Sequence, residues 1–283
     1  MEKLCVITDE ISQDFEHAIK IASEYEVKAV DLRKIWNKNI ALFNDNDLDR
    51  LDAILKKYKT KVAVITGPFA KCLLPDSRLA TTQKKDLSRN PQYNLSLFDR
   101  LVEISDYFET PYIRIFSFSR GGRIIKEENW KKMMALLRPY IEKAERLGKI
   151  LLVENDYGYH VGKLKDTRRF FEEINSDYVK LVLDPGNFYV EKEKISPEAF
   201  EYFYDRDLVA HMHVKDPKRT LFSFLGFFTV VGEGKIDYKP LFKQAIERGY
   251  KGYFSLETHS LRNKEQVSRK SLENMSKMLK ELS

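Results

Sequence analysis

Short apolar runs alternate with amphipathic stretches along the whole chain. The runs are rich in Val, Ile, Leu and Phe, while the stretches between them place apolar residues three and four positions apart, as helices that bury one face do. This alternation predicts repeated strand–helix units and a parallel sheet. We expect strands at residues 4–8, 27–33, 61–66, 112–118, 150–155, 178–184, 208–214 and 253–258.

The helical stretches carry local signals of their own. Apolar residues of the segment 48–58 fall on one face, which predicts a helix that covers the sheet. Gly148 follows another helical stretch, residues 127–147, where a left-handed residue would close the helix. Pro139 lies inside that stretch, so we expect a kink or a break there.

The number of units predicts the fold class. Eight strands, each followed by a helix, in 283 residues match a (β/α)8 barrel, for which about 250 residues are typical. We therefore expect an α/β fold, a single-domain TIM barrel that takes in residues 1–283. An open doubly wound sheet is the alternative, but the segment ITDEISQDF after the first strand has no glycine-rich phosphate fingerprint.

Composition narrows the classes of function. A hydrophobic fraction of 43% is enough for a large core. The chain has two cysteines and begins without an apolar signal stretch, which predicts a cytoplasmic protein, and no apolar run approaches the roughly 18 residues of a membrane span. The net charge of +6 permits an anionic partner, but Lys alternates with Glu along the helices. We expect solvated helix faces, with neither a nucleic acid nor a membrane as partner.

Strands five to eight all end on a carboxylate or an imidazole, namely Glu154, Asp184, His213 and Glu257. Barrel active sites lie where the C-terminal strand ends gather, so we expect these four side chains to converge. Three carboxylates repel one another unless they are protonated or neutralised, and a metal is the simplest neutraliser. The oxygen and nitrogen donors suit a divalent Mn, Mg, Co or Zn ion. His211 points to the same side about 6.6 Å further down its strand, where it packs in the barrel or supports the site.

These motifs carry a resemblance over essentially the whole chain. The opening TDEISQDFEHAIKIASEYEVKAVDLRKIWNKNI and then LLVEND, LDPGN, HVKD, GEGKIDY and SLETH, in this order, resemble the sugar phosphate isomerase/epimerase group of the xylose isomerase-like TIM barrel superfamily. The resemblance implies one divalent ion, most often Mn, held by Glu154, Asp184, His213 and Glu257 near a sugar-like substrate. It also implies that Glu154 and Glu257 flank the substrate and transfer protons.

We therefore expect a metal-dependent isomerase or epimerase of a sugar, sugar phosphate or related hydroxy-carbonyl compound, which works by glutamate-mediated proton transfer through a metal-stabilised enediolate. A dehydratase that uses the same metal would have the same sequence signature. The alternatives are an abasic-site endonuclease-like nucleic-acid enzyme and a non-catalytic metal- or sugar-binding barrel. Five histidines are too few for the trinuclear zinc cluster of the endonuclease branch.

Two arginines stand at unusual positions. Arg33 ends the second strand, where a forked guanidinium at the barrel mouth would bind a substrate carboxylate, phosphate or hydroxyl. A salt bridge to Asp31 or Glu10 is the alternative for Arg33. Arg114 lies within the predicted strand 112–118, and a charged side chain in the interior predicts a carboxylate partner.

Two further residues are candidates for substrate binding. Asn187 stands where related ketose epimerases often have a histidine, and an amide hydrogen-bonds a hydroxyl but carries no proton. Lys215 begins a basic loop with Lys218 and Arg219, near the place where many barrels bind phosphate. The apolar segment 221–231 in the same loop predicts a lid, a dimer surface of a homo-oligomer or local core.

Overall fold

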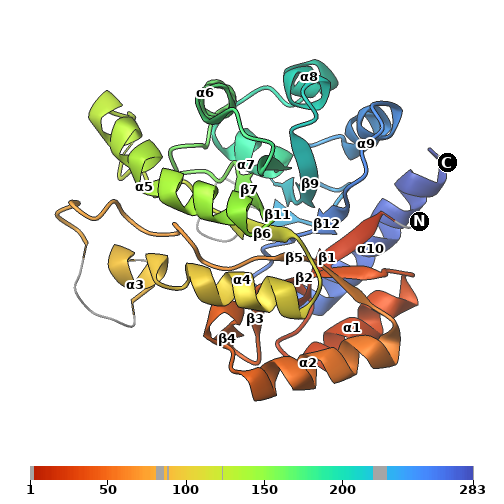
Figure 1. Cartoon of the computed structure of the whole chain (residues 1–283). Helices are drawn as coiled ribbons and strands as arrows, with labels where there is room; N and C mark the ends of the chain where they lie inside the picture. The colour runs from red at the N-terminus through yellow and green to blue at the C-terminus, as the bar shows by residue number, and fades with distance from the viewer. Residues whose placement is uncertain (1–2, 81–85, 88, 123, 219–227, 283) are drawn as a thin grey trace.

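The computed structural model describes residues 3–80, 86–87, 89–122, 124–218 and 228–282. Parallel strands close into a barrel in the order β1-β12-β9-β8-β7-β6-β5-β2, and helices surround it (Figure 1). The single-domain TIM barrel expected from the sequence is confirmed, and the doubly wound alternative is wrong. The barrel strands are β1 (Leu4–Ile7), β2 (Ala29–Leu32), β5 (Lys61–Ile65), β6 (Tyr112–Ile115), β7 (Ile150–Glu154), β8 (Val179–Leu183), β9 (Val209–Val214) and β12 (Phe254–Leu256).

The helices bury their apolar faces against the outside of the barrel in one large core. Leu48, Leu51 and Leu55 are the buried side of α2, as the spacing predicts. The helices are α1 (Phe15–Glu24), α2 (Asp45–Tyr58), α3 (Pro91–Leu95), α4 (Phe98–Tyr107), α5 (Glu127–Arg146), α6 (Leu164–Ile174), α7 (Pro185–Val190), α8 (Pro197–Asp205), α9 (Tyr238–Glu247) and α10 (Lys264–Lys280), with 3-10 turns η1 (Thr8–Glu10) and η2 (Ile40–Leu42).

Helix α5 corrects one expectation about proline. The helix continues without a break through Pro139, so the expected break is wrong. Pro139 has no N–H to donate to the carbonyl of Ala135. Both residues lie on the exposed side of the helix, where that carbonyl is open to solvent. Gly148 follows the helix with φ of +65°, as predicted.

Inward-pointing side chains divide the barrel interior into two levels. The lower level contains a small apolar cluster beside some buried polar groups, and the period of two along each strand places further polar side chains above it. Leu152 and Glu154 of β7 follow this rule, and Val182 of β8 precedes Asp184 in the same way. The apolar cluster consists of Cys5, Ala29, Ala63, Val64, Leu152 and Val182.

Two short antiparallel hairpins were not predicted. One joins β3 (Lys34–Ile35) to β4 (Lys38–Asn39), and the other joins β10 (Asp216–Pro217) to β11 (Phe228–Thr229). The expected apolar segment 221–231 lies largely outside the described residues, and its described end enters β11. Among the described helices, none is both long and apolar enough to cross a membrane.

A single carboxylate holds the loop that follows β11. The backbone amides of Gly232 and Gly234 donate to Asp216 Oδ2, and those of Lys235 and Ile236 donate to Oδ1, at 2.9–3.1 Å. A Cβ added at Gly234 would lie 2.1 Å from Asp216 Oδ1, so only glycine fits there. This contact explains why GEGKID follows HVKD in the sequence.

Candidate active site at the barrel mouth

The four expected ligand residues converge at the C-terminal end of four adjacent strands. Glu154 ends β7, Asp184 follows β8, His213 lies in β9 and Glu257 follows β12. Each is buried, and each offers a ligand atom within 4.8 Å of the others. His213 Nδ1 lies 3.2 Å from Glu154 Oε1, 3.4 Å from Glu257 Oε2 and 3.9 Å from Asp184 Oδ2. One edge of the imidazole thus faces all three carboxylates.

Lys215 lies among these carboxylates instead of in an exposed loop. It follows His213 by two residues, so its side chain enters the barrel, where it is 1% exposed. Its Nζ lies 2.7 Å from Asp184 Oδ2 and 2.6 Å from Glu257 Oε2. Burial lowers the pKa of Lys215, but Asp184 and Glu257 outweigh burial and raise this pKa well above its usual value. The expected loop cation is therefore a buried ammonium.

The other two members of the expected basic loop stand apart from this ammonium. Lys218 is exposed, and Arg219 lies outside the described residues.

Arg114 has the carboxylate partner that was predicted for it. Its Nη1 donates to Glu154 Oε2 at 2.7 Å, and its Nη2 donates to the carbonyl of Thr66 at 3.1 Å. The guanidinium stacks on Phe116 with its carbon 3.9 Å from the ring centroid. Arg114 therefore fixes one oxygen of Glu154 and leaves the other directed at His213.

Arg33 joins the site to the first βα turn. Its Nη1 donates to Glu257 Oε1 at 2.6 Å, and its Nε and Nη2 donate to Asp9 and Glu10. The predicted salt bridge to Glu10 is confirmed, whereas Asp31 pairs with His211 instead. Arg33 thus contacts a carboxylate of the site from its outer side.

Asn187 also contacts a site carboxylate. Its Nδ2 donates to Glu154 Oε1 at 3.2 Å, and its backbone amide donates to Asp184 Oδ1 at 2.9 Å at the start of α7. Its own side-chain oxygen is buried and accepts no hydrogen bond from the described residues. Asn187 therefore helps to hold two of the four expected ligands, Glu154 through its side chain and Asp184 through its backbone.

Protein charges already balance the carboxylates of the site. Burial raises the pKa of Glu154, but His213 and Arg114 outweigh it and hold this pKa well below its usual range. Burial and Glu154 raise the pKa of Asp184 to about 6 against the lowering by Lys215. Burial lowers the pKa of His213, but Glu154 and Glu257 outweigh it and raise this pKa to about 10. A metal ion is therefore not the only group that can neutralise these carboxylates. This corrects the expectation that a metal is their simplest neutraliser.

A cavity of about 270 Å³ opens above these residues. Burial and Glu154 raise the pKa of Asp156, in its wall, to about 7. The sequence pattern included Asp156 and His259 only as parts of LLVEND and SLETH and gave no signal for Lys71, Tyr157 and Tyr159. The lining comprises Lys71, Arg114, Glu154, Asp156, Tyr157, Tyr159, Lys215, Glu257 and His259.

Residues 19–280 match the model of the xylose isomerase-like TIM barrel family. The chain belongs to this family. The inosose dehydratase of Clostridium perfringens is 29% identical over 167 residues, which are 54% of this chain and 53% of that protein, so the chain spans about half the length of the curated relatives it matches.

Two solved structures show the same fold. The 3-keto-D-glucoside 4-epimerase of E. coli has a TM-score of 0.70 at 18% identity, over 98% of this chain and 99% of that chain. A xylose isomerase-like TIM barrel protein from Mycobacterium smegmatis in complex with magnesium has a TM-score of 0.69 at 16% identity, over 95% of this chain and 89% of that chain. At these identities the likeness shows the fold alone.

The donor atoms of this xylose isomerase-like barrel fit a divalent cation. Three carboxylates and one imidazole provide oxygen and nitrogen donors that converge from different strands. Asp184 Oδ2 is buried and forms no hydrogen bond with the described residues, although Lys215 Nζ lies 2.7 Å away at an unsuitable angle. An ion at this point would complete the surroundings of that oxygen.

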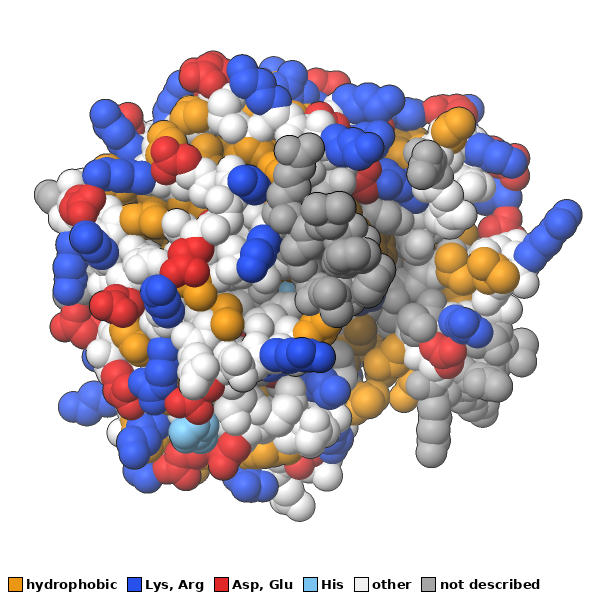
Figure 2. Space-filling view, turned by 180° about the vertical axis from the view of Figure 1, so that it is seen from behind, with side chains coloured by type: hydrophobic (Ala, Val, Ile, Leu, Met, Phe, Trp, Pro, Cys, Tyr) orange, Lys and Arg blue, Asp and Glu red, His pale blue; other side chains and the backbone are white. Residues whose placement is uncertain are grey.

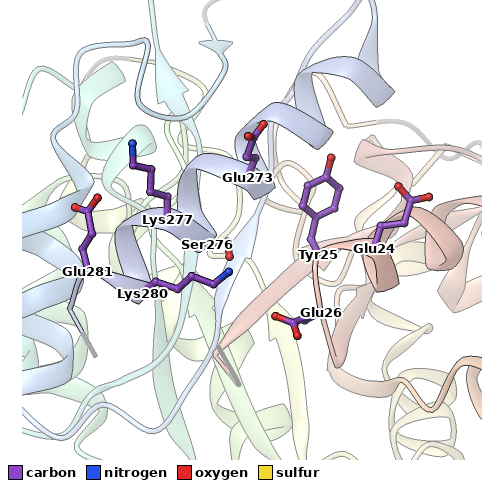
Figure 3. A pocket seen from close by; sticks show the side chains of 8 residues that line it. All are labelled: Glu24, Tyr25, Glu26, Glu273, Ser276, Lys277, Lys280 and Glu281. Carbon is purple, nitrogen blue, oxygen red and sulfur yellow. The ribbon is translucent and has the colours of Figure 1, made fainter.

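Hollows larger than the mouth cavity lie elsewhere on the described surface, and the one between α1 and α10 lacks the convergent ligand set of the mouth. A surface groove of about 520 Å³ lies between the end of α1 and helix α10, and Tyr25 and Glu273 are among its lining residues (Figure 3). It contains none of the expected site residues. Basic and acidic side chains intermix over the face that Figure 2 shows, as the alternation of Lys and Glu predicts. The mouth cavity is therefore the candidate active site.

Proposed function

We propose that the protein is a metal-dependent enzyme that transfers a proton at the carbon next to the carbonyl of a sugar, sugar phosphate or related hydroxy-carbonyl compound, as an isomerase or epimerase. The observation that carries this proposal is the convergence of Glu154, Asp184, His213 and Glu257 below the mouth cavity. These four residues would hold the ion. Mn is the first choice, and Mg, Co and Zn suit the same donors.

The ion, when bound, withdraws charge from the substrate carbonyl oxygen and stabilises the negative charge that develops as the neighbouring C–H proton leaves. Glu154 and Glu257 serve as the bases, because neighbouring cations keep both carboxylates ionised. Their strands β7 and β12 are separated in the barrel by β8 and β9. The two glutamates therefore approach a bound molecule from different sides, as epimerisation requires, whereas isomerisation needs only one of them.

The three residues predicted to bind substrate divide into two roles in this proposal. Lys215 lines the cavity, and its ammonium binds a substrate oxygen. Arg33 and Asn187 act on the substrate through the carboxylates that they hold, Glu257 and Glu154 respectively. Their hydrogen bonds fix the direction of the proton-accepting oxygens, which effective proton transfer requires.

Dehydration is the second candidate, and two observations favour it. The curated relatives that match about half of the chain are named inosose dehydratases. In addition, the pKa of Asp156, raised by burial and by Glu154 to about 7, makes this cavity residue suited to protonating a departing hydroxyl. Removal of the same C–H proton begins both reactions, so the two candidates differ only in the steps after it.

Deuterium exchange tests the shared step. Purified protein is loaded with Mn²⁺ and incubated in D₂O with a panel of hydroxy-ketones and hydroxy-aldehydes, and deuterium next to the carbonyl is measured. We expect Glu154→Gln and Glu257→Gln to slow exchange by about 10²–10⁴-fold. Glu273→Gln, which changes an exposed carboxylate of the distant groove, should leave it unchanged.

The products then separate the candidates. Loss of water in the product mass identifies a dehydratase, and a rearranged sugar of unchanged mass identifies an isomerase or epimerase. Exchange that survives both glutamate substitutions would overturn the proposal. Metal binding without exchange on any compound would favour a non-catalytic barrel, and binding of duplex DNA that weakens steeply with salt would favour the endonuclease alternative.

A further inference from the structure

A second polar cluster lies inside the barrel, one level below the four expected ligands. At its centre is the carboxylate of Asp31 in β2. Its Oδ2 accepts hydrogen bonds from His211 Nε2 at 2.8 Å and from Ser255 Oγ at 2.5 Å, and its Oδ1 lies 3.4 Å from the donor Cys5 Sγ. All four residues are buried. Three neighbours from three other strands thus hold one carboxylate in a fixed place.

His211 contacts Asp31, so the supporting role expected as one of its two alternatives would act through an intermediary. Its ring lies 5.6 Å from that of His213, centroid to centroid, at an interplanar angle of 84°. Its Nε2 is engaged by Asp31 and not by any of the four expected ligands. The residue that links the lower cluster to the site is consequently Asp31.

The imidazole of His213 has one edge without a hydrogen-bond partner. Its Nδ1 faces the three site carboxylates, whereas its Nε2 is buried and forms no hydrogen bond with the described residues. Asp31 Oδ2 lies 3.9 Å from this Nε2. That distance exceeds a hydrogen bond by about 1 Å, so a small ring movement towards Asp31 would form one.

The tautomer of His213 decides whether it can bind an ion. A neutral imidazole carries one proton, and a lone pair on Nδ1 requires that this proton be on Nε2. A buried N–H needs an acceptor, and ion-binding histidines commonly donate their second ring N–H to a carboxylate. The orientation of His213 leaves Asp31 to accept this proton.

We propose that Asp31 is a positioning residue that fixes the Nε2–H tautomer and the ring orientation of His213, and so presents Nδ1 to a divalent cation. The inference rests on the ion site in the proposed function and extends it to Asp31, which the sequence suggested only as a possible partner of Arg33. The hydrogen bonds from His211 and Ser255 hold the carboxylate of Asp31 in place.

Metal affinity tests this role without an activity assay. Mn²⁺ binding is measured by electron paramagnetic resonance of the free ion for the wild type, Asp31→Ala, Asp31→Asn and Ser255→Ala. Asp31→Ala should weaken Mn²⁺ binding by about 10–100-fold. Asp31→Asn keeps an acceptor oxygen and should lose less. Ser255→Ala removes one of the hydrogen bonds that hold the carboxylate and should weaken Mn²⁺ binding by less than Asp31→Ala.

Nitrogen NMR of His213 provides a second measurement that needs no substitution of Asp31. In the Zn²⁺-loaded wild type we expect the ring proton on Nε2 and none on Nδ1. A proton on Nδ1 overturns the proposal, as does a folded Asp31→Ala protein with wild-type Mn²⁺ affinity. If Asp31→Ala does not fold, Asp31→Asn and the tautomer decide.

A further pair of variants separates this inference from the proposed function. If Glu154→Gln and Asp184→Asn leave Mn²⁺ affinity unchanged, the ion does not bind the four expected ligands and the proposed function fails. If those two variants lose Mn²⁺ binding while Asp31→Ala retains it, only the positioning role fails.

Discussion

Lys215→Met removes the buried ammonium that contacts two of the site carboxylates. Its Nζ lies 2.7 Å from Asp184 and 2.6 Å from Glu257, and methionine has a similar length without the charge. Removal of one partner from a buried ion pair costs about 3–5 kcal/mol. Glu257 keeps Arg33, and Asp184 takes up a proton readily because burial and Glu154 have already raised its pKa to about 6. We therefore expect the lower end, about 3 kcal/mol.

In a barrel of this size each kcal/mol corresponds to about 2–4 °C in Tm, so the metal-free variant should melt about 6–12 °C below wild type. A divalent ion at about 1,000 times its Kd adds about 4 kcal/mol to the folded state. In the wild type, an ion held by Asp184 and Glu257 would compete with Lys215 for its two carboxylate contacts. Mn²⁺ should consequently raise the Tm of Lys215→Met by more than it raises that of wild type.

The assay is thermal unfolding followed by circular dichroism at pH 7, in EDTA and in excess Mn²⁺. Lys180→Met is the matched control, because Lys180 pairs with Asp207, whose side chain is 99% exposed. That control should change stability by no more than about 1 kcal/mol. The reasoning is refuted if Lys215→Met and wild type have the same Tm in EDTA, or if Mn²⁺ raises the Tm of both proteins equally.

Two further outcomes are expected from the site and its loop. Since Glu154 and Glu257 raise the pKa of His213 to about 10 despite the lowering by burial, this imidazole is protonated at pH 7 and must lose its proton to bind an ion. Mn²⁺ binding should release about one proton and weaken about tenfold per pH unit as the pH falls below that pKa, which calorimetry in buffers of different ionisation enthalpy measures. Gly234→Ala places a Cβ 2.1 Å from Asp216 Oδ1 and should destabilise the loop after β11, as proteolysis will show, whereas Gly122→Ala meets no atom within 4 Å and should not.

The periodicity of the sequence predicted the barrel and its inward-facing residues. A period of two along β7 to β9 and β12 places Glu154, Asp184, His213 and Glu257 on the inside, and parallel strands place their C-terminal ends at one mouth. The inward direction of each side chain depends only on its own strand, and the shared mouth depends only on the strands being parallel. Both could therefore be predicted from the sequence.

Contacts across the barrel were not predictable in the same way. Asp31 and His211 are 180 residues apart and lie on β2 and β9, which are not neighbouring strands. Their meeting depends on strand stagger and tilt, which no single-strand pattern records. The pattern places Lys215 in a loop because the apolar run ends at Val214, although Lys215 shares the inward parity of His213.

The charge of the site connects the buried cations to the proposed chemistry. Glu154, Asp184 and Glu257 are already paired with Arg114, Lys215 and Arg33. A divalent ion adds two positive charges to a group that is close to balance, and excess charge in a buried site is costly. Departure of the His213 proton removes one of these charges. Transfer of the substrate C–H proton to Glu154 or Glu257 would leave the total charge unchanged but move a negative charge from the carboxylate to the substrate oxygen. Stabilisation of that oxygen charge in the transition state, by the ion and by Lys215, is what catalysis requires.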